Sequence, residues 1–68
     1  MLLKNLKYDD VFHFQDDNDE NELVVVFESE TIVQFDSLSK LNSTSLCINK
    51  EWDYMGKREV VKLYNKSE

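Results

Sequence analysis

Two side chains of this sequence have the chemistry of a catalytic nucleophile and its base: the single cysteine, Cys47, and the single histidine, His13. A cysteine nucleophile needs a neighbouring base and an oxyanion site made of hydrogen-bond donors. With one glycine, Gly56, the chain has no glycine-rich segment to supply such donors. His13 alternates with Phe12 and Phe14, which places it on the outer face of a strand or in a partly buried, hydrogen-bonded position. We therefore predict that the chain is not an enzyme.

Oxygen donors occur once at the spacing of a calcium-binding EF-hand loop. With Asp17 as the first position, Asp19, Asn21 and Glu28 follow at the third, fifth and twelfth positions of the motif. Glu22 takes the place that requires glycine, and strand-like rather than helical segments flank the loop. One histidine and one cysteine also fall short of the four ligands of a structural zinc site. We predict no metal and no cofactor.

Carboxylates are concentrated in one part of the chain. Residues 8–39 contain ten of the 14 acidic residues and none of the eight Lys and Arg residues, which gives this stretch a formal charge of −10. The rest of the chain is net basic at +4, and the whole chain has a charge of −6. We predict that the acidic stretch forms the partner-binding face, whose residues are Asp9, Asp10, Asp16, Asp17, Asp19, Glu20, Glu22, Glu28, Glu30 and Asp36.

Two interpretations of this charge stay open. The charges keep a small domain soluble, or they imitate the field of a nucleic-acid duplex, which carries one charge per roughly 1.7 Å of its axis. A compact acidic protein of the second kind occupies the basic groove of a nucleic-acid-handling or defence protein and inhibits it by excluding the substrate. The predicted partner is then a protein with a basic surface, and electrostatics set the association rate more than the affinity.

The 68 residues are enough for a single domain, 1–68, and a domain of this size buries about 60% of its unfolded surface. One cysteine cannot form an internal disulfide, so good packing or self-association must stabilise the fold. The contents of 41% hydrophobic and 12% aromatic residues exceed those of a disordered acidic tail. The longest apolar run, 23–27, is too short for a membrane span or a signal sequence. We expect a cytoplasmic protein that does not contact membranes.

Period-two patterning predicts the strands that would position these side chains, at residues 11–14, 23–27, 31–35, 46–54 and 59–64. In 46–54 the alternation places Trp52 and Tyr54 in the core, with Lys50 at the one discordant position. Gly56 is expected to adopt positive φ in a hairpin turn between the last two strands.

The connecting segments are polar. Residues 16–22 are expected to form a solvated loop, and residues 37–42 either one short helical turn or a loop. Five short strands in so few residues predict an all-β fold, either a small antiparallel five-stranded SH3-like barrel or a strongly bent sheet.

Both ends of the chain carry a family resemblance. Residues 3–14 read LKNLKYDDVFHF, which resembles the opening of small SH3-like β-barrel proteins of the kind often encoded by tailed phages. Those proteins often begin with leucine, x, x, leucine, lysine, x, glycine, aspartate, x, phenylalanine, and Asp9 stands at the position of the glycine. Residues 60–64 are similar to their short last strand. The resemblance implies the fold only, because small barrels host unrelated functions.

Two further kinds of partner follow from apolar and basic residues. Val24 and Val26 alternate away from their neighbours in a strand that is apolar on both faces, and an outward patch there predicts a homodimer or a structural or accessory subunit. Basic and aromatic residues also surround the last predicted hairpin. They are the residue types of a surface on which nucleic-acid bases stack, namely Lys50, Trp52, Tyr54, Lys57 and Arg58. The charge of −6 opposes phosphate binding, so we predict no direct contact with nucleic acid.

Overall fold

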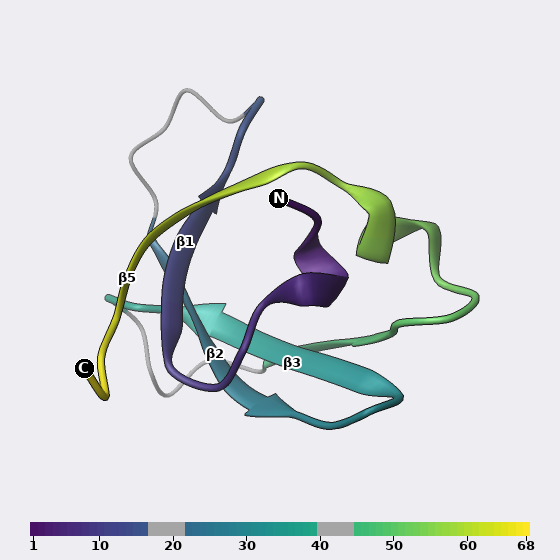
Figure 1. Cartoon of the computed structure of the whole chain (residues 1–68), viewed down its shortest axis with the longest axis horizontal. Coiled ribbons are helices and arrows are strands. Elements are labelled where there is room, and N and C mark those ends of the chain that lie inside the picture. The colour runs from purple at the N-terminus through teal and green to yellow at the C-terminus, as the bar shows by residue number, and fades with distance from the viewer. Residues whose placement is uncertain (17–21, 40–44) are drawn as a thin grey trace.

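Five antiparallel strands form one sheet in the computed structural model, which describes residues 1–16, 22–39 and 45–68 (Figure 1). The strands are β1 (Asp10–Phe14), β2 (Leu23–Glu28), β3 (Ile32–Ser37), β4 (Leu46–Asn49) and β5 (Val60–Asn65). Their order in the sheet is β4-β3-β2-β1-β5, so β4 and β5 are the edges. Within the described residues the helical elements are two short 3-10 turns, η1 (Leu3–Asn5) and η2 (Tyr54–Lys57). The all-β prediction is confirmed, and the sheet is not closed.

The core lies against one face of the curved sheet. Phe12 on β1 and Phe35 on β3 are buried, and their ring centroids lie 5.6 Å apart in an edge-to-face arrangement. Phe14 packs beside both rings, which confirms that Phe12 and Phe14 share one face of their strand. Edge-to-face pairs of this kind add about 0.5–1.5 kcal/mol to the burial of each ring.

The N-terminal segment fills the remaining side of the core. Leu3 and Leu6 are fully buried, and the backbone N–H of Leu3 donates to the carbonyl of Arg58 at 2.9 Å. A β-bridge joins Leu2 to Glu59, just before β5. Figure 1 shows this segment inside the curve of the sheet, between β1 and η2. The N-terminal segment is therefore held against the residues that lead into β5.

A tight turn leads from the N-terminal segment into β1. The backbone N–H of Asp10 donates to the carbonyl of Lys7 at 3.0 Å, and Asp9 has a φ of 69°. This left-handed conformation favours glycine, and Asp9 stands at the glycine of the SH3-like pattern. The turn is present without its glycine, because aspartate is one of the few residues that tolerate left-handed backbone.

The fourth strand is shorter than its alternation predicts. β4 ends at Asn49, whose side-chain Oδ1 accepts the backbone N–H groups of Glu51 at 2.8 Å and of Trp52 at 3.3 Å. An Asx turn of this kind diverts the chain from the sheet. Trp52 and Tyr54 are each 79% exposed, so their predicted place in the core is wrong.

Gly56 also has a different role from the predicted one. It lies within η2 rather than in a hairpin turn, and its φ is not positive. It is buried, and a Cβ at this position would lie 3.4 Å from the Cβ of Lys4 and 3.6 Å from the carbonyl oxygen of Lys50. A Cβ would make ordinary van der Waals contacts here, so neither the backbone conformation nor the packing requires glycine.

The other predicted strands are confirmed to within about two residues. The loop predicted at 16–22 lies mostly outside the described part of the chain, which omits residues 17–21. The segment predicted as a helical turn or a loop at 37–42 is described only as far as residue 39. Ser37 ends β3, and 38–39 form a turn. No helix in the described residues is long and apolar enough to cross a membrane.

Candidate functional site

One residue of the predicted acidic face, Asp10, is buried at the start of β1, with 1% of its surface exposed. Its carboxylate accepts the backbone N–H of Lys7 and the side-chain amide of Asn65, both at 2.7 Å, and Lys62 Nζ lies 3.4 Å away. Burial alone would raise the pKa of Asp10, but these hydrogen bonds and the Lys62 charge outweigh it and hold the pKa below its usual value. Asp10 thus joins the first turn to β5 and is not at the surface.

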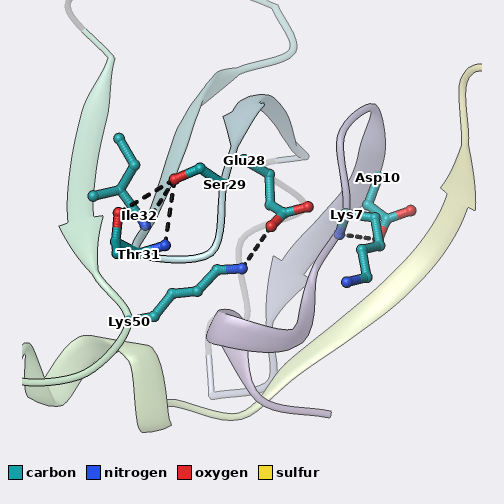
Figure 2. A network of polar contacts seen from close by, with 7 residues as sticks. All are labelled: Lys7, Asp10, Glu28, Ser29, Thr31, Ile32 and Lys50. Carbon is teal, nitrogen blue, oxygen red and sulfur yellow. Dashed lines mark hydrogen bonds and ion pairs between the residues drawn. The ribbon is translucent and has the colours of Figure 1, made fainter.

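Glu28, at the end of β2, is a second carboxylate that is paired inside the fold. Lys50 Nζ lies 2.6 Å from its Oε2, with the two side chains only 15% and 17% exposed (Figure 2). The hydrogen bond from Lys50 is the main reason why the pKa of Glu28 is lowered, and it outweighs desolvation. The backbone N–H of Lys50 also donates to the carbonyl of Thr31 at 2.8 Å. The pair fixes the chain after β4 against the β2–β3 turn.

Asp36 and Asp16 account for two more members of the predicted face. Asp36 is buried on β3, next to Val24 in register, and its Oδ1 accepts the backbone N–H of Ser37 at 2.7 Å. Asp16 is exposed after β1 and forms an ion pair of 2.9 Å with Arg58. Asp36 belongs to the interior, while Asp16 remains at the surface.

The remaining members of the acidic face are more open. Glu22 and Glu30 are exposed on either side of β2, and Asp9 is half-buried in the first turn. Asp17, Asp19 and Glu20 lie outside the described residues. Of the predicted acidic face, the described residues that the fold leaves at the surface are Asp9, Asp16, Glu22 and Glu30, and they come from several loops.

A shallow depression of about 510 Å³ lies at the other end of β1 and is lined by Gln15, Asp16, Arg58 and Glu59. The guanidinium of Arg58 sits 4.0 Å from the centroid of the Phe14 ring, a cation–π contact that fixes its plane. All three charged side chains that line the depression are already paired, since Asp16 binds Arg58 at 2.9 Å and Glu59 binds the N-terminal ammonium at 3.0 Å. This depression therefore carries little unmatched charge for a ligand.

His13 and Cys47, the two residues with nucleophile and base chemistry, are not brought together. His13 is on β1 and Cys47 on β4, so the sheet order separates them by three strand spacings, roughly 14 Å. The Nδ1 of His13 lies 3.0 Å from the carbonyl oxygen of Phe14, and Cys47 is exposed. Among the described residues, no group of His, Cys, Asp or Glu side chains has the geometry of a metal site.

The sequence interpretation missed the exposed aromatic residues. Trp52 and Tyr54 are the most exposed of the large hydrophobic side chains described, and Val61, Leu63 and Tyr64 on β5 are between 40% and 50% exposed. The signal that could have found Trp52 is Asn49 followed by the charged Lys50 and Glu51, a combination that ends a strand more readily than it continues one.

Comparison with protein-family models, with curated proteins and with solved structures finds no match in any of the three. Function is therefore inferred from the surface of this chain.

Proposed function

We propose that the chain is an SH3-like protein-binding module of the tailed-phage kind, and that its acidic surface engages a partner with a basic surface in the cytoplasm. Two features support the SH3-like fold: the five-stranded antiparallel sheet and the left-handed Asp9 at the glycine position of the resemblance. An exposed, unpaired thiol at Cys47 is typical of a reducing compartment.

The observation that carries the proposal is that internal pairing leaves the acidic excess at the surface. Lys50, Arg58 and Lys62 each contact a carboxylate of the 8–39 stretch, and each such pair removes one charge of either sign. The net charge of −6 is unaffected by this pairing. Glu22 directly precedes β2 and Glu30 lies in the turn after it, and both are exposed, so each end of this strand carries an acidic side chain at the surface.

A field of this kind suits the groove of a protein that binds nucleic acid. Such grooves are basic because phosphate contacts supply much of their affinity. An acidic protein of similar width competes for the same groove, and its association is accelerated by attraction and slowed by salt. We infer an inhibitor or DNA mimic that blocks a nucleic-acid-handling or defence protein.

The proposal is tested by binding proteins from an extract of the source organism to the immobilised chain at low salt, then eluting with duplex DNA. Mimicry predicts that DNA displaces the bound proteins. It also predicts that Glu22→Gln/Glu30→Gln weakens retention, whereas Glu59→Gln/Glu68→Gln, with the same change in net charge, does not. Proteins that DNA fails to displace would refute mimicry, and equal weakening by both double variants would refute a defined acidic surface.

A homo-oligomeric structural or accessory subunit is the second candidate, and the exposed side chains of β5 favour it. The Val24 and Val26 patch predicted from the sequence is not open, since Val24 is 2% exposed and Val26 is half-buried. Leu63 and Tyr64 lie instead on an edge strand, which can pair with a second copy. Light scattering after size-exclusion chromatography tests it: a dimer that Leu63→Lys dissociates supports this candidate, and a monomer at millimolar concentration refutes it.

A further inference from the structure

The segment between β4 and β5 is held by several hydrogen bonds at once. The Asn49 side chain caps the turn that follows β4, and the backbone of Lys50 is bonded to Thr31. Asp53 begins η2 by accepting the backbone N–H of Met55 at 3.0 Å. Capping of this kind stabilises a short turn by about 1 kcal/mol. The backbone that carries residues 51–54 therefore has a defined conformation.

This ordered backbone presents two aromatic rings to solvent. Trp52 and Tyr54 are 79% exposed, so neither contributes much burial to the fold. Tryptophan and tyrosine are the residues most enriched among the anchors of protein interfaces, because a large rigid ring gains much contact for little loss of conformational freedom. An ordered turn with two such rings has the properties of a binding surface.

Two of the cations near these rings are committed elsewhere. Lys50 is bound to Glu28 and only 15% exposed, while the guanidinium of Arg58 lies on Phe14 and contacts Asp16. Of the three bases that the sequence suggested for a phosphate-binding platform, only Lys57 is exposed. Lys4 is half-buried beside Gly56 of η2. These contacts remove most of the positive charge that a nucleic acid would need.

Exposed carboxylates belong to this turn and to the turn that is bonded to it. Glu51 directly precedes Trp52 and is exposed, and Glu30 is exposed on the β2–β3 turn, whose Thr31 is bonded to Lys50. The charge around Trp52 is therefore suited to a cation, and cations bind over the face of an indole ring more strongly than over any other side chain.

We propose that Trp52, Tyr54 and Glu51 form the docking site for an arginine-bearing basic segment of the partner protein. The guanidinium lies on the Trp52 ring, and the Glu51 carboxylate accepts its hydrogen bonds. Arginine suits this site better than lysine because its planar group stacks on a ring and binds a carboxylate in a bidentate manner. This inference rests on the proposed function, which requires a basic partner, and adds the contact that anchors it.

Trp52 is the only tryptophan of the chain, so its fluorescence reports directly on the site. The test titrates the protein with an acetylated hexa-arginine amide, with the hexa-lysine counterpart and with a thymidine oligonucleotide, and follows Trp52 emission. Calorimetry measures the same titrations for Trp52→Leu, for Glu51→Gln and for the control Tyr64→Leu, which removes an exposed ring on β5. Trp52 is exposed, so Trp52→Leu leaves the core intact.

The expected result is saturable quenching by hexa-arginine that is stronger than by hexa-lysine. Trp52→Leu should weaken hexa-arginine binding about fivefold and Glu51→Gln about threefold, while Tyr64→Leu changes nothing. Suppose that Trp52→Leu leaves hexa-arginine binding unchanged while Glu22→Gln/Glu30→Gln weakens it. That result would overturn this inference and leave the proposed function standing. Absence of binding by either cationic peptide at low salt would count against both. Quenching by the oligonucleotide alone would assign the site to nucleic acid and overturn the inference.

Discussion

Replacing Asp10 by asparagine should destabilise the protein more than any other single loss of charge in the acidic stretch. The carboxylate accepts two hydrogen bonds of 2.7 Å, from Lys7 and from Asn65, in a site that is 1% exposed. An asparagine there can accept from one of these donors, but its own N–H group then faces the other. A hydrogen bond to a charged group contributes about 1.5–3 kcal/mol, and a buried donor without a partner adds a further penalty.

We therefore expect Asp10→Asn to lower the free energy of unfolding by about 2 kcal/mol, which for a domain of this size lowers the melting temperature by roughly 8–16 °C. Thermal and urea unfolding followed by circular dichroism measure it, with the exposed Glu30→Gln as the control that changes charge alone. Asn65→Ala in the same background should show a coupling of about 1 kcal/mol in a double-mutant cycle. A loss below about 0.5 kcal/mol, or strict additivity with Asn65→Ala, would refute the reasoning.

The pH dependence of this difference follows from the lowered pKa of Asp10. A carboxyl whose pKa is lower in the folded state than in the unfolded state stabilises the fold at pH values above its unfolded pKa of about 3.9. That stabilisation is lost as the pH falls through the lower, folded value. The gap in stability between the native protein and Asp10→Asn should be constant from about pH 5 to 7 and should shrink below about pH 4. A gap that widens in acid would contradict the assignment of the charge.

Three further substitutions test other contacts. Asp9→Gly should raise the free energy of unfolding by about 0.5–1 kcal/mol, because it removes the left-handed strain at φ 69°. Asp9→Ala, which loses the same charge, should not raise it, and thermal unfolding compares the two variants. Gly56→Ala should leave the free energy of unfolding unchanged or raise it by up to about 0.5 kcal/mol, because the φ of Gly56 is not positive and the new Cβ would contact Lys4 at 3.4 Å. A decrease of more than about 1 kcal/mol in urea unfolding would mean that no Cβ fits at this position. Lys50→Met should lower the free energy of unfolding by about 1–2 kcal/mol, because it leaves the Glu28 carboxylate without its cation. Adding Glu28→Gln should restore part of this loss, because it removes the unpaired charge. No recovery in the double variant would show that the two side chains are not coupled.

The strands near the start of the chain could be predicted because their burial is decided locally. In β1 the alternation of Phe12 and Phe14 with the half-buried His13 matches the pleat, and both rings join the core. β2 and β3 likewise place β-branched and aromatic residues in the core, namely Val25, Val33 and Phe35. The patterning in such strands predicts both the element and its orientation.

The end of β4 was not predicted, because the apolar alternation outweighed a local turn signal at Asn49 and because Lys50 is held by a side chain from elsewhere in the chain. Apolar alternation continues to Tyr54, but Asn49 caps a turn and Lys50 is drawn to Glu28, 22 residues earlier. Lys50, the one residue that did not fit the alternation, lies directly after the end of the strand. A salt bridge between distant residues leaves no periodic signal in the sequence.

The division of the acidic stretch was equally out of reach of the sequence. Asp10 and Glu30 have the same charge and lie in the same acidic run, yet Asp10 is buried because Asn65, 55 residues away, reaches it. The neighbours of a carboxylate in the fold, rather than in the chain, decide whether it stabilises the interior or faces a partner.

The charge asymmetry of this chain therefore has two separable consequences. Three ion pairs, Asp10–Lys62, Glu28–Lys50 and Asp16–Arg58, each join the acidic stretch to the basic remainder, so opposite charges in the two parts favour their association in the folded chain. What stays exposed, including Glu22 and Glu30, creates the field outside the fold, through which the proposed function would attract a basic partner. A loss of partner binding in Glu22→Gln/Glu30→Gln can be attributed to that field, because neither residue supports the core. The same loss in Asp10→Asn would have to be corrected for unfolding first, so the binding experiments must use the exposed carboxylates.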